Sequence, residues 1–471
     1  MTLFFNLHRV RTTCIVLATV FLVGCQNTTT ELRGNGLVLG NRANEPKLRT
    51  PKTTDPVLVR APKAHPTEVP KPIPPKRAAA SKRIVLTPPE NINAQVRVGL
   101  LLPLSGPRSS VGQTLLDAAL LAVFDIANEN FVLVPVDTKG SPDGAEIAAQ
   151  EAVAAGVKLV IGPVFSESVR RAAPTILDAG LNMIAFSNDR SVAQPGVFLS
   201  GLLPETQIDR VVRFASSRGL RKIAAIVPPG PFGASVVKTL QLAAMATGME
   251  VTRIREYGNT PEKIAAAIRS ISDYDDRRNA LLKLREDLEG REDEGSRSAL
   301  ERLDILETLG PTPFDALLVA ASGNDLINAA AQLGNYDIDT KRTRILGTSA
   351  WAIESTGREP SLVGAWFATP PLDVASEFSI KFRDMFEATP PAIGSSAYDL
   401  VALAAILGSR DGGPNYDRNT LTSEAGFVGV SGLFRFKPSG LVERDLEVRE
   451  VQARGSRVLH PARGQFNDQT N

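Results

Sequence analysis

The sequence is poor in the two residue types that most often carry out catalysis or hold a transition metal. It has 2 Cys and 3 His among 471 residues, and the histidines are His8, His65 and His460. None of them lies between residues 94 and 451, where the patterns below predict the folded part. This excludes Ser-His-Asp and Cys-His catalysis and the usual zinc sites there, so we expect no bound metal. Only carboxylate or lysine chemistry is left open.

The chain also lacks an excess of charge of either sign. Its 53 Lys and Arg nearly balance its 51 Asp and Glu, so it has no basic footprint and we expect no nucleic-acid partner. The sequence contains no P-loop and no paired-carboxylate motif. Gly426, Gly429 and Gly432 are regularly spaced, but they accompany a hairpin pattern and not a strand-to-helix turn, which argues against a nucleotide site. We therefore expect no cofactor and no enzymatic activity.

The N-terminus has the pattern of a secretion signal. Arg9 and Arg11 precede an apolar run over residues 14–22, which is too short to span a bilayer as an uncleaved anchor. The residues that end this run, Leu22-Val23-Gly24-Cys25, resemble the lipobox of bacterial lipoproteins. The resemblance implies that residues 1–24 are a signal peptide and that Cys25 receives the lipid.

Lipidation would make acyl chains the only attachment to a membrane, each buried CH₂ contributing about 0.8 kcal/mol. Cys14 would leave with the signal, so the mature chain would have no free thiol and no disulfide. Gln26 follows the lipidated Cys, which by the rules of such lipoproteins implies the outer membrane and a periplasm-facing chain.

Residues 25–93 have the composition of a disordered tether. Between Pro46 and Pro89 there are 11 Pro interleaved with Lys and Arg, and large apolar residues are sparse. Such a segment cannot bury enough surface to offset the entropy of ordering it. It is either a plain spacer or a tether that lifts a head domain from the membrane.

From residue 94 onward, short apolar strands alternate with helical patterns. The first strand is expected over 96–102, followed by a helix over 114–128 and a second strand over 131–136. This rhythm is typical of parallel sheets with helices on both faces, and it is too long for one such sheet. We therefore predict an α/β fold with two doubly wound, parallel-sheet lobes.

Residues 274–309 interrupt the rhythm. They are dense in charge, and Leu281, Leu284 and Leu288 have the spacing of one helix face. We expect a helical insertion on the surface. It is either a solvated helical pair or a docking surface for another protein.

Several motifs, in order, resemble the type I periplasmic binding proteins of the Leu/Ile/Val-receptor group. They are Leu101-Leu102-Pro103-Leu104-Ser105-Gly106, Val160-Ile161-Gly162-Pro163, Phe232-Gly233 and Ala397-Tyr398-Asp399-Leu400. Other segments resemble a narrower branch, the penicillin-binding-protein activator lipoproteins. They are Tyr274-Asp275-Asp276-Arg277, Gly347-Thr348-Ser349-Ala350-Trp351, Gly364-Ala365-Trp366-Phe367 and the predicted hairpin that begins at Gly429-Val430-Ser431-Gly432.

The resemblance implies two lobes joined by three crossovers. Lobe one would comprise residues 94–203 and 372–425, and lobe two residues 205–371 and 426–451. A flexible tail would follow over 452–471.

The resemblance also implies a ligand cleft between the lobes. The lobe-one candidates are Ser105, Phe165, Ser166, Ser187 and Asn188, and the lobe-two candidates are Phe232, Ser322, Asn324 and Trp351. Ser166 and Ser187 have the alternative role of capping a helix. Phe232 stands where the family has an aromatic hydroxyl, and Asp325 is only a candidate partner for a ligand ammonium, which argues against a free amino acid.

Two non-catalytic functions follow from these patterns. The first is a regulatory lipoprotein whose head binds and activates a peptidoglycan synthase, that is, a penicillin-binding protein. The second is the solute receptor of an ABC transporter for branched-chain amino acids or another small polar ligand. The anchor, tether and insertion favour the first, which is the function that we expect from the sequence. The predicted fold favours the second, which is the alternative.

Overall fold

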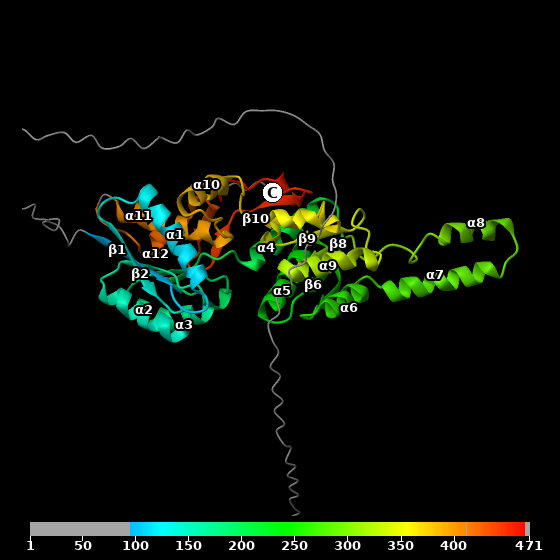
Figure 1. The fold of residues 1–471 in the computed structure, drawn as a ribbon, viewed down its shortest axis with the longest axis horizontal. Coiled ribbons are helices and arrows are strands. Elements are labelled where there is room, and N and C mark those ends of the chain that lie inside the picture. The colour runs from blue at the N-terminus through cyan, green and yellow to red at the C-terminus, as the bar shows by residue number, and fades with distance from the viewer. Residues whose placement is uncertain (1–94, 411, 467–471) are drawn as a thin grey trace, which may run out of the picture. The chain divides into compact units, whose positions relative to one another are not determined.

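The computed structural model describes residues 95–410 and 412–466. Their strands form two main sheets, each flanked by helices, which confirms the predicted fold class (Figure 1). The predicted signal peptide, the lipidated Cys25 and the tether lie outside the described residues.

The sheet of lobe one has five parallel strands in the order β2-β1-β3-β4-β5. Its strands are β1 (Val96–Leu102), β2 (Phe131–Asp137), β3 (Leu159–Ile161), β4 (Met183–Ala185) and β5 (Val197–Leu199). Its helices are α1 (Ser109–Ile126), α2 (Pro142–Ala154), α3 (Ser166–Asp178), α10 (Val374–Phe386), α11 (Ala392–Gly408) and α12 (Arg418–Leu421), with the 3₁₀ turn η2 (Arg190–Val192).

The apolar runs explain why these strands are central. β1 is VRVGLLL, and five of its last six residues are apolar and buried, as both faces of a parallel sheet demand. α1 packs against α11, and α2 packs against α3 (Figure 1). α1 alone among the described helices is long and apolar enough to cross a membrane, but Leu115, Ala118 and Leu121 on it are buried in the core of lobe one.

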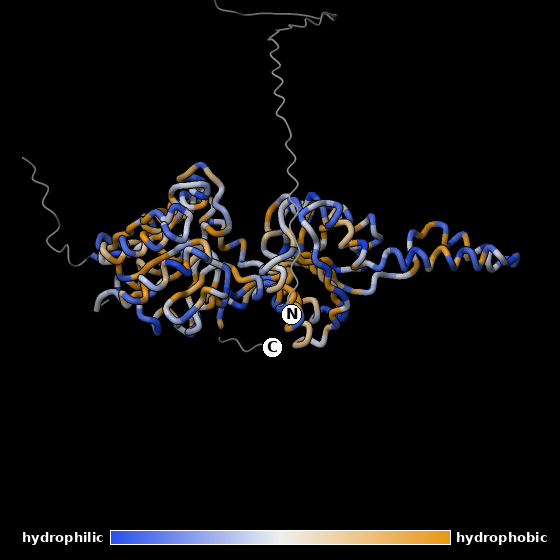
Figure 2. The backbone as a smooth tube through the Cα atoms, turned by 90° about the horizontal axis from the view of Figure 1, so that it is seen from below, coloured by the Kyte–Doolittle hydropathy of each residue, from blue (hydrophilic) through white to orange (hydrophobic). Residues whose placement is uncertain are grey.

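The sheet of lobe two has seven strands in the order β15-β14-β10-β9-β8-β6-β7. Its strands are β6 (Lys222–Val227), β7 (Glu250–Glu256), β8 (Ala316–Val319), β9 (Arg344–Gly347), β10 (Trp366–Thr369), β14 (Glu447–Val451) and β15 (Ser456–His460). The first five are parallel, whereas β14 and β15 add an antiparallel edge. Figure 2 shows hydrophobic stretches of the chain in the interior of both lobes.

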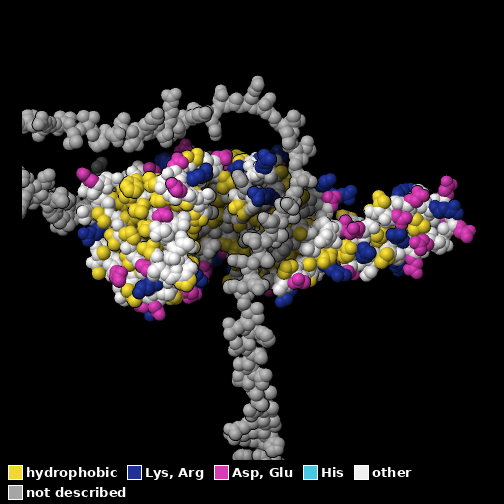
Figure 3. Space-filling view, in the orientation of Figure 1, with side chains coloured by type: hydrophobic (Ala, Val, Ile, Leu, Met, Phe, Trp, Pro, Cys, Tyr) yellow, Lys and Arg dark blue, Asp and Glu magenta, His cyan; other side chains and the backbone are white. Residues whose placement is uncertain are grey.

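The helices of lobe two cover both faces of this sheet, and one pair extends away from it. They are α4 (Pro204–Ser217), α5 (Pro231–Thr247), α6 (Pro261–Ile271), α7 (Tyr274–Glu289), α8 (Glu294–Leu303) and α9 (Gly323–Asn335), with the 3₁₀ turns η3 (Ser349–Trp351), η4 (Glu354–Arg358) and η5 (Pro360–Leu362). α7 and α8 are the charged insertion, and Figure 3 shows both signs of charge interspersed along them.

Two expectations about the C-terminal part need correction. The strands β11 (Phe427–Gly429), β12 (Gly432–Phe436) and β13 (Val442–Arg444) form a small antiparallel sheet that packs on lobe one, not lobe two. The reason is that Phe434 and Phe436 join the lobe-one core, where the Phe436 ring lies 5.4 Å from that of Phe198. The tail is not wholly flexible either, because β15 pairs with β14 and so extends the lobe-two sheet.

The chain passes between the lobes three times, after β5, after β10 and after β13. Buried polar groups hold these crossovers. Arg444 donates to the Ser200 carbonyl oxygen (2.9 Å) in the first, and Glu447 accepts from the Leu372 N–H (3.1 Å) in the second. Helix α11 carries the Ala397-Tyr398-Asp399-Leu400 motif. Its Asp399 carboxylate accepts from the N–H groups of Val430 and Ser431 (2.7 and 2.9 Å).

Candidate functional site

A cavity of about 690 Å³ lies at the carboxyl ends of the lobe-one strands. Ligands of open α/β folds bind at this edge, where helix N-termini converge. Four of the predicted residues line it, namely Phe165, Ser166, Ser187 and Asn188. The rest of the lining is Pro107, Arg108, Lys139, Gly140, Pro142, Val164, Glu167, Ser168 and Asp189.

The turn from β3 into α3 brings the N-terminus of α3 to this cavity. A side chain at Gly162 would place its Cβ 2.2 Å from the Leu101 carbonyl oxygen, so only glycine fits there, at φ +97°. The residue at the N-cap is Phe165, which offers no side-chain hydrogen bond to the helix. The N-cap side chain therefore leaves the first N–H groups of α3 uncapped, and such groups are suited to an anion.

Ser168, in the first turn of α3, has a feature that the sequence did not indicate. Its side chain is 1% exposed, it lines the cavity, and its hydroxyl oxygen has no hydrogen-bond partner among the described residues. A buried hydroxyl without a partner costs about 1–3 kcal/mol. A ligand group that bonded to it would recover that free energy.

Neither serine that was a capping candidate caps a helix by its side chain. Ser166 is the first residue of α3, one position after the N-cap. The Ser187 hydroxyl accepts from the Asp189 N–H (3.1 Å), which closes a local turn after β4. Both residues line the cavity.

Both acidic side chains of the cavity lie beside one arginine. Arg170 contacts Glu167 at 2.5 Å and Asp189 at 3.6 Å. Burial alone would raise the pKa of Asp189, but hydrogen bonds from Ser191 and Ser166 and the charge of Arg170 lower it overall. Asp189 is therefore an ionised group that is already satisfied within the protein.

The cavity also holds two cations without acidic partners. Neither Arg108 nor Lys139 forms an ion pair within the described part of the chain, and Arg108 stacks over the Phe165 ring at 4.3 Å. Sequence patterns missed both residues. Their positions in the sequence could have indicated them, because each residue follows the carboxyl end of a strand that is predicted to be parallel.

Ser105 lies beside the cavity but not in its lining. Its N–H donates to Asp137 Oδ1 (3.1 Å), and so do those of Leu104 and Lys139 (2.8 Å each). Burial opposes the charge on Asp137, but these hydrogen bonds and one from the Ser105 hydroxyl lower its pKa. Asp137 thus ties together the two loops that carry Arg108 and Lys139.

The lobe-two candidates do not join this cavity, whose lining lies wholly in lobe one. Phe232 is exposed at the start of α5, and Ser322 and Asn324 are exposed at the start of α9. The expectation for Trp351 was wrong. Trp351 is 1% exposed in the lobe-two core, because its ring fills the space that a side chain at Gly347 would occupy. Its Nε1–H donates to the Ala321 carbonyl oxygen (2.9 Å).

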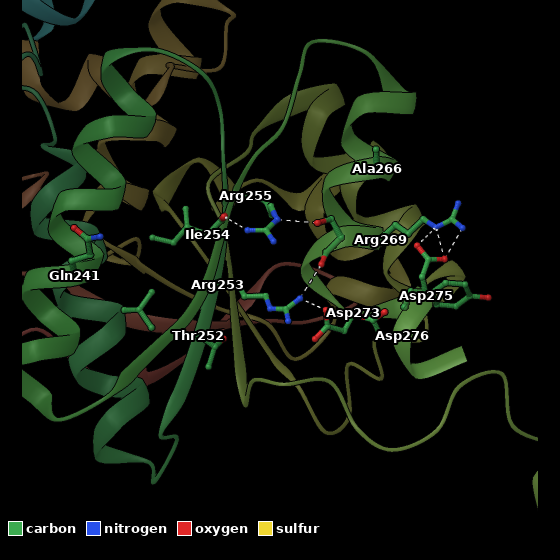
Figure 4. A pocket seen from close by; sticks show the side chains of 13 residues that line it. Gln241, Thr252, Arg253, Ile254, Arg255, Ala266, Arg269, Asp273, Asp275 and Asp276 are labelled. Atoms are coloured by element: carbon green, nitrogen blue, oxygen red, sulfur yellow. Dashed lines mark hydrogen bonds and ion pairs between the residues drawn. The ribbon is translucent and has the colours of Figure 1, made fainter. Parts of the chain in front are cut away.

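A second cavity, of about 930 Å³, lies at the outer edge of lobe two beside β7. Its arginines already have partners, as Figure 4 shows. Arg253 pairs with Asp273, Arg269 pairs with Asp275 (2.6 Å), and Arg255 donates to Ser270 (2.9 Å). Each of these arginine side chains is therefore already bonded within the protein.

The fold and the cavity together define a two-lobed α/β protein with a cavity at the carboxyl ends of the lobe-one strands. The model of the periplasmic binding protein family matches residues 95–455, and the chain belongs to this family. The family is periplasmic, and its members bind small ligands between two lobes and are not enzymes.

Solved structures of this kind share the fold at low sequence identity. A protein assigned to a branched-chain amino acid ABC transporter of Rhodospirillum rubrum is 17% identical at a TM-score of 0.60, covering 78% of this chain and 100% of its own. An ABC transporter solute-binding protein of R. palustris with bound benzoate is 16% identical (TM-score 0.54; 80% and 98%). The Streptococcus pneumoniae branched-chain amino acid binding protein with isoleucine is 16% identical (TM-score 0.52; 78% and 100%).

Among curated proteins, an uncharacterized protein of Rickettsia prowazekii is 22% identical over 183 residues. The match covers 39% of this chain and 48% of that protein, so the chain matches about half the length of this relative.

Proposed function

We propose that this chain is the solute-binding protein of an ABC transporter, and that it binds the carboxylate of a small ligand at the N-terminus of α3. The carrying observation is Ser168, a buried hydroxyl that has no partner in the described part of the chain and lies beside a helix N-terminus whose N-cap residue forms no side-chain cap. The ligands in two similar structures, benzoate and isoleucine, each have a carboxylate. That chemistry suits the donors of this cavity.

The donors have complementary roles. The first N–H groups of α3 offer aligned dipoles, and the hydroxyls of Ser168 and Ser187 offer hydrogen bonds to carboxylate oxygens. A hydrogen bond to a charged group is worth about 1.5–3 kcal/mol. Several such bonds, together with burial of the ligand's apolar part, support micromolar affinity.

Calorimetric titration of the purified protein with isoleucine, leucine and benzoate tests the proposal. Binding of one of them, weakened about tenfold or more by Ser168→Ala, is the expected result. Ser110→Ala is the matched control, because Ser110 is exposed on α1 outside the cavity lining. Binding that Ser168→Ala leaves intact would place the ligand elsewhere and contradict the proposal.

A second function is favoured by the α7–α8 pair. This pair extends from lobe two (Figure 1), and apolar side chains on it and just after it are uncovered. Leu282 on α7 is 51% exposed, and Ile305 and Leu306 after α8 are 84% and 41% exposed. Such a surface suits a protein partner, and the regulator function would make that partner a peptidoglycan synthase at the cell wall. The exposed leucine and isoleucine side chains would then be the anchors of the contact.

A pull-down from detergent-solubilised envelope distinguishes the two functions. The regulator function predicts that the wild-type protein recovers a peptidoglycan synthase and that Leu282→Glu/Ile305→Glu does not. Leu242→Glu is the control, because Leu242 is equally exposed (52%) on α5. Equal recovery by all three proteins, or recovery of no synthase, excludes docking through this pair and leaves the transport function.

A further inference from the structure

The C-terminal segment after β15 returns from lobe two toward lobe one. β15 ends at His460, whose Nδ1 accepts a hydrogen bond from Arg210 (2.7 Å) on α4. Arg210 also donates to the carbonyl oxygen of Leu446 (2.8 Å), in the third crossover. Residues 461–466 then pass beside this crossover and reach the small sheet of β11, β12 and β13 on lobe one. The segment therefore spans the two lobes in addition to the three crossovers.

The third crossover is short and contains a buried carboxylate. It consists of Asp445 and Leu446, which link β13 to β14, and Asp445 is 4% exposed. The Asp445 carboxylate accepts from the Gly464 N–H (2.9 Å) and lies 3.6 Å from the Arg463 guanidinium, and the charge of Arg210 also acts on it. A buried carboxylate is costly unless it is hydrogen-bonded and paired. Two of the groups that satisfy this carboxylate thus come from the returning segment.

Phe466 anchors the far end of the segment. Its ring lies under the Arg435 guanidinium, which is 4.3 Å from the ring centroid. That guanidinium is fixed in the small sheet by the Glu443 carboxylate (2.9 Å) and the Glu424 carbonyl oxygen (3.0 Å), so it offers the ring a rigid surface. Gly426 leaves room for the ring, because a Cβ at Gly426 would lie 2.8 Å from Phe466 Cε2.

We infer that residues 461–466 form a strap that restrains movement of the two lobes about the crossovers. Hinge motion changes the backbone angles of a few linking residues. Such a change at Asp445 would move its carboxylate away from the Gly464 N–H, and movement of lobe two, which carries β15, would pull Phe466 away from Arg435. The strap therefore has to release before the lobes move far. This inference concerns the hinge and does not depend on which ligand the cavity binds.

Distances between one spin label on each lobe, measured by double electron–electron resonance, test the inference. The two cysteines of the chain are replaced by serine, and the labels are attached at Glu151→Cys on α2 and Lys238→Cys on α5, which are exposed positions. We expect the population outside the main distance peak to rise about two- to fivefold in Phe466→Ala, which loses the stacking on Arg435. A chain that ends after His460 loses the whole strap, and this population should rise about tenfold or more.

Phe124→Ala is the matched control, because Phe124 is an exposed phenylalanine (74%) on α1 that takes no part in the strap. Circular dichroism melting of each variant verifies folding, and Phe466→Ala decides the question if the shortened chain does not fold. A distance distribution of Phe466→Ala that matches the wild type overturns the inference. An equal change in Phe124→Ala also overturns it, because the change would then be a general effect of losing a phenylalanine.

Discussion

Asp137 organises the candidate site although it lies outside the cavity lining. One of its carboxylate oxygens accepts three backbone N–H groups, from Leu104, Ser105 and Lys139. We predict that Asp137→Ala lowers the free energy of unfolding by about 1–3 kcal/mol, because three donors lose their acceptor. Urea unfolding at pH 7 measures the change, and Asp143→Ala, at an exposed carboxylate on α2, should change it by less than about 0.5 kcal/mol.

The contribution of Asp137 also depends on pH, because its pKa in the folded protein is lower than usual. A depressed pKa means that the stability is present above the unfolded pKa of about 4 and is lost as pH falls through the folded value. The difference between wild type and Asp137→Ala should therefore shrink below pH 4. A constant difference from pH 7 to pH 3 would show that the charge of Asp137 plays no part.

Residue types and spacing predicted only part of the site. Phe165, Ser166, Ser187 and Asn188 follow strands of one sheet, so their convergence could be expected from topology. The missing partner of the Ser168 hydroxyl could not, because the satisfaction of a buried group depends on its three-dimensional neighbours. Trp351 was misassigned for the same reason, since an aromatic residue after a strand can face the core or a cleft.

At the scale of elements, Arg277 anchors the α7–α8 pair to lobe two. It is 9% exposed, and it donates to the Gly310 carbonyl oxygen and to Asp337 (both 2.9 Å). Only Arg277 and Leu281 of α7 are buried, so the pair has little apolar contact to hold it. We predict that Arg277→Ala opens residues 274–309 locally while the sheet stays folded.

Hydrogen exchange detected by mass spectrometry measures this local opening. Protection should fall in α7 and α8 and stay unchanged in β6, β8 and β9 of the sheet. Arg278→Ala is the matched control, because Arg278 is exposed and donates to the hydroxyl of Tyr274 (3.2 Å), one turn earlier on the same helix. Loss of protection throughout lobe two would show that the pair is not a separate unit.

The alternation of elements was predictable because each strand and helix has its own periodicity. The lobe to which an element belongs was not always predictable. The β12–β13 hairpin showed its alternating faces in sequence, but the alternation does not say that Phe434 and Phe436 meet the lobe-one core. β15 escaped prediction because its residues, Ser456–His460, are polar enough for a tail and become a strand only beside β14.

At the scale of the whole described chain, the crossovers between the lobes contain buried charged side chains, and each of these needs a counter-charge beside it. Glu447 and Arg449 are 4% and 7% exposed and contact each other at 2.5 Å, while Glu447 also accepts from the Leu372 N–H of the second crossover. Removal of one member of such a pair leaves a buried charge without its counter-charge, which costs about 3–5 kcal/mol. Removal of both charges leaves no buried charge without its counter-charge, so it should cost much less.

We therefore predict strong coupling between Glu447→Gln and Arg449→Met in urea unfolding. Each single variant should lose about 3–5 kcal/mol, and the double variant should lose far less than their sum. The pair Arg457 and Glu450 serves as the comparison. Arg457 is largely exposed (63%), so the same cycle there should give about 1 kcal/mol or less. Additive losses at Glu447 and Arg449 would mean that the crossovers are held by packing and backbone hydrogen bonds. Strong coupling would show that this one ion pair contributes to the stability of the crossovers.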